Sequence, residues 1–479
     1  MYEIYPVNFV EMKTRQTFQN VEITDISTEG KGIGRVNNIV CFIDFAVPGD
    51  VVDIEITKKK SNYREGKVIH YQKYSEKRIE PVCKHFGTCG GCKWQNLNYE
   101  TQLFYKQKYV VDALTRIGHL SSETSKFFTI LPSKNIFHYR NKLEFTFSHR
   151  RWLTHEEIKV LPFGEDLGGA LGFHIPKLFD KVLDIEECHL QEDPSNAIRL
   201  EVKKYAVENK LEFFDIRRQR GFLRNLIIRS TSIGQWMIVV VFFYEDKSAR
   251  EKLLKHLSEK FTQITSLQYV INPKKNDSIF DLEIKTFSGK DFIEEEMERL
   301  KSRISPKSFF QTNSSQAYEL YKVAREFAEL KGKEIVYDLY TGTGTIANFV
   351  AKNAKKVIGI EYIPEAIEDA KINSQINNIS NTEFFAGDIK DTLNDEFISA
   401  HGKPDVIITD PPRAGMHEGV VRKILEISPD KIIYVSCNPA TQARDISLMN
   451  EQYSVEKVQP VDMFPHTAHV ESVAQLVLK

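Results

Sequence analysis

The sequence lacks the segments that mark membrane-spanning or exported proteins. No apolar stretch approaches the length needed to cross a bilayer. The first residues, MYEIYPVNFVEMKTRQ, contain no basic region followed by an apolar run. With 41% hydrophobic and 27% charged residues, the 479-residue chain has the composition of an ordinary globular protein. We therefore expect a cytoplasmic monomer with no membrane partner.

The chain also lacks an overall charge excess and a disulfide framework. Its formal net charge is −1, so only the local distribution of charge can indicate a nucleic-acid partner. Six cysteines in so long an intracellular chain are too few for a disulfide scaffold, and clustered spacing indicates metal binding or catalysis instead. They are Cys41, Cys83, Cys89, Cys92, Cys188 and Cys437.

No internal repeat, low-complexity tract or long linker interrupts the chain, yet its length exceeds what one core usually organises. We expect a multidomain α/β protein. The expected domains are an OB-like β-barrel over 1–78, an α+β central domain over 79–300 and a Rossmann-like catalytic domain over 301–479.

The N-terminal region alternates short β-type segments with turns such as EGKGIG and VPGD, which predicts a small barrel. Between Lys58 and Arg78, the sequence contains eight Lys or Arg residues and only two Glu residues. These are interleaved with Tyr63, His70, Tyr71 and Tyr74. Basic groups and aromatic rings are typical of an RNA-binding surface. A solvated charged face is the other interpretation.

The segment PVCKHFGTCGGCKW spaces Cys83, Cys89 and Cys92 by five and two residues, and a fourth thiol is available at Cys188. The double glycine allows the backbone to approach an inorganic centre closely. Four cysteines can hold zinc or an iron–sulfur cluster, and ligand identity alone does not decide between them.

The central region contains a helical pattern from Glu100 to Arg116, followed by strand-rich segments. In KLEFTFS, Leu143, Phe145 and Phe147 alternate with polar residues, as in a sheet covered on one face. Five arginines concentrate positive charge nearby, and either RNA contact or an ordinary solvated surface explains them. They are Arg217, Arg218, Arg220, Arg224 and Arg229.

From Glu334 onward, strand and helix patterns alternate strictly, which predicts a parallel sheet with helices on both faces. The first three strands end at Asp338, Glu361 and Asp388. A carboxylate at the second strand end suits ribose hydroxyls, and one at the third suits an adenine amino group. No Walker-type lysine loop is present, which disfavours ATP hydrolysis.

The next two strands bring DPPR, beginning at Asp410, and SCNP, containing Cys437, to the same edge. The connection to the last apolar run is too short for a parallel crossover, so the last strand must run antiparallel. Its beginning, near His469 and Glu471, then lies at the edge that holds Cys437. We expect Cys437 and Glu471 to share one site.

A thiol and a carboxyl at one site suit methylation of a uracil ring. Carbon 6 of uracil accepts a thiolate, which makes carbon 5 nucleophilic enough to take a methyl group. A carboxylate then removes the surplus proton from carbon 5, and the thiol is eliminated. A stacked base is unreachable, so the target must be flipped outward.

Together, SCNPAT, HTAHVE, DPPRAG, FFQTN and DLYTGTGT resemble the motifs of the RNA uracil-5-methyltransferases. The N-terminal barrel resembles the TRAM domain. With the cysteine cluster, it is similar to the branch of the family that acts on 23S ribosomal RNA. The resemblance implies S-adenosylmethionine as methyl donor and a 4Fe-4S cluster on Cys83, Cys89, Cys92 and Cys188.

The resemblance also implies roles for single residues. Cys437 is the expected nucleophile and Glu471 the expected base. Phe309 and Phe310 are expected either to stack on a base or to lie in the core, and Thr345 stands where one branch of the family often has Asn. The expected cofactor residues are Gln311, Tyr340, Glu361, Asp388 and Asp410, with Asp410 also close to the uracil.

Three alternatives remain beside a 23S ribosomal RNA methyltransferase. One is a tRNA uracil-5-methyltransferase, and another is a non-catalytic ribosomal-RNA-binding assembly factor. The third is methylation of an exocyclic nitrogen, for which DPPR lacks the usual aromatic residue and the thiol has no use.

Overall fold

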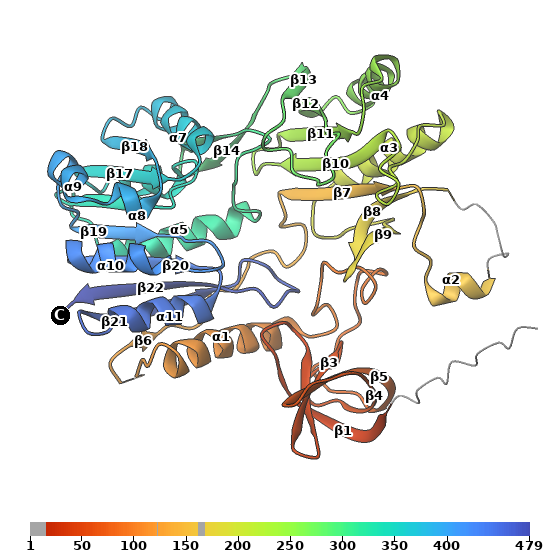
Figure 1. Ribbon diagram of the computed structural model, residues 1–479, viewed down its shortest axis with the longest axis horizontal. Helices are drawn as coiled ribbons and strands as arrows, with labels where there is room; N and C mark the ends of the chain where they lie inside the picture. Colours follow the sequence, from red (N-terminus) through yellow and green to blue (C-terminus); the bar gives the residue numbers. More distant parts are fainter. Residues whose placement is uncertain (1–15, 122, 161–167) are drawn as a thin grey trace, which may run out of the picture. The chain divides into compact units, whose positions relative to one another are not determined.

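The computed structural model describes residues 16–121, 123–160 and 168–479 (Figure 1). The chain divides into two compact units. The first contains the described residues up to Val82 together with Lys93–Gln102, and the second contains Cys83–Cys92 and Leu103–Lys479.

The first unit is a closed five-stranded barrel, which confirms the predicted OB-like fold. Its strands follow the order β1-β2-β3-β5-β4, and β3 pairs in parallel with β5. Alternating residues such as Ile23, Ile43 and Ile54 are completely buried in its core. The strands are β1 (Thr17–Ile26), β2 (Gly32–Val36), β3 (Ile39–Asp44), β4 (Val51–Lys59) and β5 (Tyr63–Lys73).

An ion pair between the buried Asp50 and Arg78 ties the segment after β5 to the residue before β4. The Asp50 carboxylate accepts hydrogen bonds from Val47 N at 2.8 Å and Ser75 N at 2.9 Å. It also accepts two from Arg78, at 2.8 Å from Nε and 2.7 Å from Nη2. The Arg78 guanidinium stacks on Tyr71 at 4.8 Å from the ring centre. The last arginine of the basic stretch therefore stabilises the barrel.

The second unit contains two large sheets, and the first is a mixed seven-stranded sheet of order β13-β12-β11-β10-β7-β8-β9. Phe145 and Phe147 point from β7 into a core that helices α3 and α4 complete, as the alternation in KLEFTFS predicts. The strands are β7 (Lys142–Ser148), β8 (Ala170–Ile175), β9 (Leu178–Asp184), β10 (Leu223–Ser230), β11 (Trp236–Phe242), β12 (Ile264–Ile271) and β13 (Ile284–Gly289). The helices are α3 (Ser195–Glu208) and α4 (Lys247–Lys260).

Other elements lie before, within and after the stretch of chain that forms this sheet. They are α1 (Tyr99–Arg116), β6 (Lys126–Phe127), α2 (His155–Val160) and the hairpin of β14 (Ile293–Met297) and β15 (Leu300–Ile304). Helix α1 confirms the predicted helix and packs Val110, Ala113 and Leu114 against the second sheet.

The second sheet has eight strands in the order β18-β17-β16-β19-β20-β22-β21-β6. Its first five strands are parallel, and β22 runs antiparallel to both neighbours, as predicted. The strands are β16 (Ile335–Leu339), β17 (Lys356–Glu361), β18 (Thr382–Ala386), β19 (Val406–Thr409), β20 (Lys431–Ser436), β21 (Tyr453–Val461) and β22 (Glu471–Leu478).

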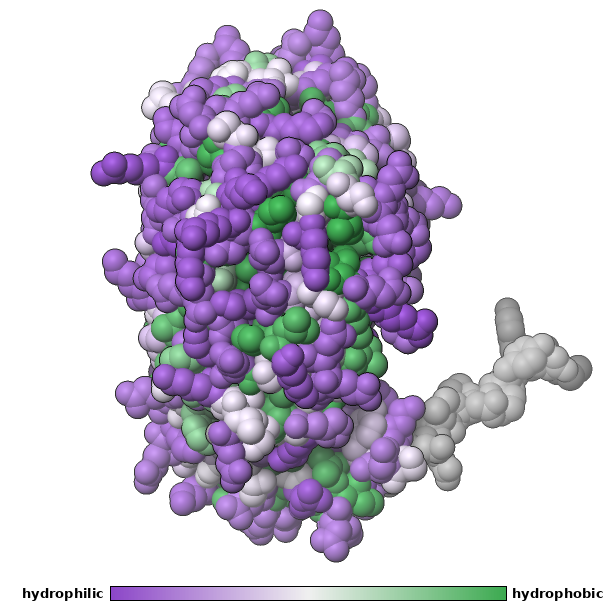
Figure 2. All heavy atoms as spheres, turned by 90° about the vertical axis from the view of Figure 1, so that its left-hand side faces the viewer, coloured by the Kyte–Doolittle hydropathy of each residue, from purple (hydrophilic) through white to green (hydrophobic). Residues whose placement is uncertain are grey.

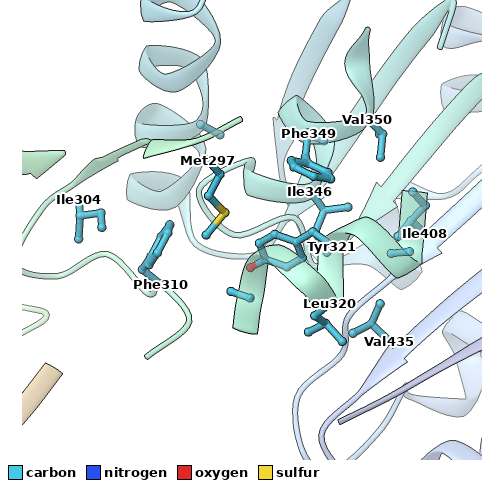
Figure 3. Packing of buried hydrophobic residues seen from close by; sticks show 14 of the residues in the cluster. Met297, Ile304, Phe310, Leu320, Tyr321, Ile346, Phe349, Val350, Ile408 and Val435 are labelled. Carbon is cyan, nitrogen blue, oxygen red and sulfur yellow. The ribbon is translucent and has the colours of Figure 1, made fainter. Parts of the chain in front are cut away.

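Helices cover both faces of this sheet, which completes the Rossmann-like architecture. One face packs against α5 (Ser314–Ala328), α6 (Thr345–Ala351) and α7 (Pro364–Ile376). The other packs against α1, α8 (Ile389–Thr392), α9 (Asp395–His401), α10 (Glu418–Ile427) and α11 (Pro439–Met449). Figure 3 shows Leu320 and Tyr321 of α5 packed close to Ile346 of α6.

The face of the molecule in Figure 2 is mostly hydrophilic, with hydrophobic side chains in small scattered groups. Single exposed apolar residues are normal on a globular surface. Within the described residues, no helix combines the length and hydrophobicity needed to span a membrane.

Candidate active site

The strand register brings Cys437 and Glu471 together. Ser436, the last residue of β20, pairs with Ser472 of the antiparallel strand β22. The next pair of positions along this ladder is Cys437 and Glu471, because neighbouring residues on antiparallel strands advance in opposite directions. The parallel strands β16, β17 and β19 end at the same edge of the sheet. The expected juxtaposition is therefore present.

Local backbone chemistry holds the Cys437 thiol at this edge. Asn438 caps helix α11 by accepting a hydrogen bond from Ala440 N at 3.2 Å, and Pro439 occupies the first turn. The Asn438 side chain also donates to the Arg413 carbonyl at 3.0 Å. These contacts fix the loop that follows Asp410 against the helix that begins beside the thiol.

The pKa of Cys437 is raised to about 11. Burial is the largest cause, and the negative charges of Glu471 and Asp410 also contribute. Arg413 opposes both effects, because its positive charge lowers the pKa of the thiol. The resting side chain is therefore a thiol. Thiolate formation at neutral pH requires a change in this electrostatic balance.

Glu471 and Asp410 are carboxyls whose ionised forms are disfavoured by burial. Glu471 is 3% exposed, and burial followed by the charge of Asp410 raises its pKa well above the usual range. Asp410 is partly exposed, yet desolvation and then the charge of Asp338 raise its pKa to about 7. Within the described residues, neither carboxyl receives a side-chain or backbone hydrogen bond. With a pKa of about 7, Asp410 can exchange a proton near neutral pH, and Glu471 holds its proton more tightly than an exposed glutamate does.

Asp338 has a different, structural role in the glycine-containing turn. Its carboxylate accepts hydrogen bonds from Thr341 Oγ1 at 2.5 Å and Ala347 N at 3.0 Å. Complete burial still raises its pKa to about 7. Asp338 thus ties the turn to the start of helix α6.

The glycine-containing turn adopts left-handed backbone conformations. Tyr340, Gly342 and Gly344 all adopt positive φ angles, of 62°, 54° and 74°. A side chain added at Gly342 would meet no atom within 4 Å, so the space above its backbone is open. Glu361 accepts hydrogen bonds from Gly342 N and Ile363 N, each at 3.1 Å. Its carboxylate is thereby aligned at the end of β17.

Tyr340 connects this turn with the third strand end. Burial raises the pKa of its phenol to about 12, and Asp445, Asp388 and Glu361 raise it in that order. Asp388 caps α8 by accepting a hydrogen bond from Lys390 N at 3.1 Å. Tyr340 therefore lies within electrostatic reach of two other expected cofactor residues, Glu361 and Asp388.

The FFQTN segment contains both exposed and buried aromatic side chains. Phe309 is 70% exposed, whereas Phe310 is 7% exposed and belongs to the core shown in Figure 3. Gln311 is buried, and its carbonyl accepts a hydrogen bond from Asn141 Nδ2 at 2.8 Å. Thr345, where one branch of the family often has Asn, begins helix α6 with its hydroxyl 3.3 Å from that of Thr343.

The expected cluster cysteines all lie in the second unit. Gly91 N donates a hydrogen bond to Cys89 Sγ at 3.5 Å, and the charge of Cys83 raises the pKa of Cys188, after burial as the first cause. Across the described ranges, no three His, Cys, Asp or Glu side chains are gathered closely enough to hold a metal ion.

The five arginines of the central domain divide into two groups. Arg224 is completely buried and donates to the Asn272 carbonyl at 2.9 Å, and Arg229 is 6% exposed and donates to the Ser308 carbonyl at 2.8 Å. These two are structural, so neither of the two interpretations left open, RNA contact or an ordinary solvated surface, applies to them. Arg217, Arg218 and Arg220 are exposed at a turn between α3 and β10.

Sequence patterns gave no role to two residues beside the reactive groups. Arg413 lowers the pKa of both Cys437 and Glu471. The buried phenol of Tyr321 lies within electrostatic reach of Asp410, Asp338 and Glu471. Arg413 could have been found from DPPR, but Tyr321 follows the apolar periodicity of α5 and carries no separate signal.

Comparisons with known proteins agree with this architecture. The family model of the tRNA (uracil-5-)-methyltransferases matches residues 229–479, and the TRAM domain model matches residues 13–69. An uncharacterized RNA methyltransferase of Bacteroides thetaiotaomicron is 55% identical, over 95% of this chain and all of the relative. One from Chlorobaculum tepidum is 39% identical, over 94% of this chain and 92% of the relative.

Among solved structures, the chain is similar to the Pyrococcus abyssi tRNA (uracil-54, C5)-methyltransferase in complex with S-adenosyl-L-homocysteine. The TM-score is 0.72 at 29% sequence identity, and the match covers 96% of this chain and all of the solved one. The similarity extends beyond the eight-stranded sheet to nearly the whole chain.

Proposed function

Because the chain belongs to the tRNA (uracil-5-)-methyltransferase family, we propose that it methylates carbon 5 of a uridine in RNA. One observation supports this proposal: the β20–β22 ladder ends at the pair of Ser436 and Ser472, one residue short of Cys437 and Glu471, and the charge of Glu471 raises the pKa of Cys437, after burial as the first cause. A nucleophile and a proton acceptor at one site are what carbon-5 methylation requires.

S-adenosylmethionine is the proposed methyl donor, and it supplies an electrophilic methyl group. The residues at the strand ends fit such a ligand, since the space above Gly342 is open and Glu361 is aligned beside it. Glu361 would hold ribose hydroxyls, and Asp388 the adenine amino group. Tyr340, Gln311 and Asp410 would complete the contacts. The similar P. abyssi enzyme was solved with S-adenosyl-L-homocysteine.

In the proposed reaction, the deprotonated Cys437 would form a bond to carbon 6. The electron pair displaced toward carbon 5 would take the methyl group as the bond between that group and the sulfonium sulfur breaks, and S-adenosylhomocysteine would leave. Negative charge develops transiently on oxygen 4 of the ring. Asp410, whose pKa of about 7 keeps it partly protonated, can donate a hydrogen bond there. Arg413 favours the thiolate through its positive charge.

Glu471, in its ionised form, would complete the reaction by accepting the proton from carbon 5. The electrons of that C–H bond restore the ring double bond as the bond between carbon 6 and sulfur breaks. A buried carboxylate with a raised pKa is a stronger base than one in water, so the burial of Glu471 suits this step.

We propose 23S ribosomal RNA as the substrate and the cytoplasm as its location. The barrel and the cysteine cluster support this choice, through the resemblance to that branch of the family. The solved relative, in contrast, is a tRNA methyltransferase, which makes tRNA the second candidate substrate. We further propose three domains with boundaries at 1–78, 79–300 and 301–479, acting as a monomer.

We also propose a 4Fe-4S cluster on Cys83, Cys89, Cys92 and Cys188. Thiolates are the usual ligands of such clusters, and Gly91 N donates to Cys89 Sγ, but in the described residues these thiols are not gathered closely enough to hold a metal ion, so the proposal rests on the family resemblance. The cluster would hold the segment around Cys89 to the segment around Cys188, and methyl transfer itself needs no redox step. Iron and sulfide analysis of anaerobically purified wild type and Cys89→Ser tests the assignment.

The test of the function uses RNA in which uridine is replaced by 5-fluorouridine. Fluorine at carbon 5 cannot leave as a proton does, so the wild type should form a stable covalent adduct through Cys437. The Cys437→Ala variant should form none. An active wild type that methylates uridine but forms no adduct would contradict the thiol mechanism. Mass mapping of ribosomal RNA and tRNA from cells lacking the protein decides between the two substrates.

A further inference from the structure

The loop between β21 and β22, residues 462–470, is held through three consecutive backbone carbonyls. Asn313 Nδ2 donates to the Met463 carbonyl at 2.9 Å. Lys106 Nζ donates to the Phe464 carbonyl at 2.9 Å, and Tyr139 Oη to the Pro465 carbonyl at 3.0 Å. The three donors come from the cap of α5, from α1 and from the segment before β7. We call Asn313, Lys106 and Tyr139 the loop clamp.

Each donor of the loop clamp is itself buried. Asn313 is completely buried, Lys106 is 1% exposed and Tyr139 is 6% exposed. Hydrogen bonds in such surroundings are stronger than in water, and losing one leaves a buried polar group unsatisfied. The path of the loop is therefore closely determined.

An ion pair anchors the start of the same loop. Lys106 Nζ lies 2.5 Å from Asp462 Oδ1, and both side chains are fully buried. Asp462 Oδ1 also accepts a hydrogen bond from Phe464 N at 3.2 Å. The two partners are 356 residues apart in sequence, so the pair joins α1 directly to the loop.

The carbonyl that Lys106 holds is linked by further hydrogen bonds to the segment just before Glu471, the proposed base. Phe464 O, which Lys106 holds, also accepts a hydrogen bond from Thr467 Oγ1 at 2.7 Å. Thr467 Oγ1 in turn accepts one from His469 N at 3.2 Å. Glu471, the first residue of β22, follows two residues later. A continuous series of hydrogen bonds thus connects Lys106 with the segment that delivers the carboxyl.

A buried ion pair is poor evidence for stability as such, because well-packed apolar residues of similar size often replace it without loss. Its retention needs another reason, and the fixed geometry of a loop is one. Proton removal from carbon 5 requires the carboxylate within hydrogen-bond reach of that carbon, and a displacement of about 1 Å can slow such a step about 100-fold.

We propose that Lys106 and Asp462, with Tyr139, are positioning residues that orient Glu471 for removal of the proton from carbon 5. This inference rests on the proposed function. None of the three touches the substrate in this account. They act by fixing the loop, so their loss should slow the step that Glu471 performs and leave formation of the thioether intact.

The test measures the methylated RNA–protein adduct that accumulates when proton removal is slow. The double variant Lys106→Met/Asp462→Leu removes both charges together, so no buried charge is left unpaired. We expect it to keep a melting temperature near that of the wild type. Its turnover should fall about 10- to 100-fold with KM for RNA nearly unchanged, and the methylated adduct should accumulate on ordinary uridine RNA.

Tyr139→Phe is the second variant, because it removes one hydroxyl with almost no change in volume. Its turnover should fall severalfold, and its adduct should rise above the wild-type level. Arg224→Met is the matched control. Arg224 is a fully buried cation that holds carbonyls of the 272–277 segment, so its loss should lower the melting temperature without adduct accumulation.

Glu471→Gln separates failure of the inference from failure of the proposed function. If Glu471→Gln accumulates the adduct while the double variant and Tyr139→Phe show wild-type adduct levels, the positioning role is overturned and the base assignment stands. If Glu471→Gln itself turns over like the wild type without adduct, the base assignment fails, and with it the inference.

Discussion

Two regions of this protein bury a carboxyl group in opposite ways. In the barrel, the Asp50 carboxylate accepts hydrogen bonds from Val47 N, Ser75 N and the Arg78 guanidinium. At the edge of the catalytic sheet, Glu471 is equally removed from water but receives no hydrogen bond from the described residues, and its pKa is raised well above the usual range.

The difference separates structural from chemical use of the same functional group. A carboxylate satisfied by an arginine and two backbone amides stays ionised and stabilises the fold. A carboxyl left beside another carboxyl binds a proton more tightly and can exchange it during a reaction. Replacing a carboxyl with an amide should therefore lower the free energy of unfolding in the barrel and raise it at the edge of the eight-stranded sheet.

The largest contrast is expected between two cysteines. Replacing Cys437 with Ala should reduce methyl transfer at least about 10⁴-fold, because the covalent step is removed. Cys41 is completely buried in the barrel core, so Cys41→Ala should lower the free energy of unfolding by about 1 kcal/mol and leave turnover unchanged. Methyl-transfer assays and thermal unfolding of both variants check this. Equal activity losses would remove the contrast.

The next contrast concerns stability. Asp50→Asn should lower the free energy of unfolding by about 3 kcal/mol, because Arg78 loses its buried partner. Asp410→Asn should raise it by roughly 1–2 kcal/mol at pH 8, allowing for the partial exposure of Asp410. Urea unfolding at pH 8 measures both values.

The sign of the Asp410 effect follows from its pKa. The folded-state pKa of about 7 exceeds the usual value of 3.8, so the folded state binds the proton more tightly. The contribution of this group to stability is fully present below the unfolded pKa and is lost as the pH rises from about 4 to about 7. The stabilisation by Asp410→Asn should therefore disappear near pH 4, and a gain that persists there would contradict this cause.

A smaller effect is expected on the reactivity of the thiol. The pKa of Cys437, raised to about 11, means that its alkylation rate should increase about tenfold per pH unit between pH 7 and 9. Asp410→Asn removes one negative neighbour, so the pKa of the thiol should fall and alkylation at pH 8 should accelerate. Mass spectrometry of iodoacetamide-treated protein follows the modification of Cys437. An unchanged rate would show that Asp410 does not influence the thiol.

The smallest expected effect concerns RNA binding, and it compares exposed with buried arginines. Arg217, Arg218 and Arg220 are exposed, and Arg224 is buried and satisfied by carbonyls. Replacing the three exposed arginines with Ala should weaken RNA binding and reduce the slope of log affinity against log salt by about 2, as expected for lost phosphate contacts. Lys247→Ala/Lys255→Ala, on exposed positions of α4, is the control. An equal slope in both variants would exclude this turn from the RNA surface.

Much of the fold and part of the site follow from the sequence, because they depend on local periodicity. The alternating strands and helices after Glu334 determine the parallel sheet, and the short connection before His469 determines the reversed last strand. Together they place Cys437 and Glu471 at one edge without knowledge of any tertiary contact.

The remaining features depend on partners far apart in sequence. Lys106 lies on the helix face that also contains Leu103 and Val110, and a charge there signals a buried partner without identifying Asp462. From the sequence alone, Arg224 and Arg229 resemble surface residues. Their hydrogen-bond acceptors, the carbonyls of Asn272 and Ser308, are distant in sequence, so no local pattern predicts these contacts. Burial and pairing of charges are decided by tertiary structure.

The most direct test of the central claim follows the hydrogen at carbon 5. Single-turnover reactions on RNA with [5-³H]uridine should release tritium with the wild type. With Glu471→Gln, a covalent adduct on Cys437 should accumulate that carries both the new methyl group and the tritium. Release of tritium by Glu471→Gln at the wild-type rate would contradict the role of this buried carboxyl as the base.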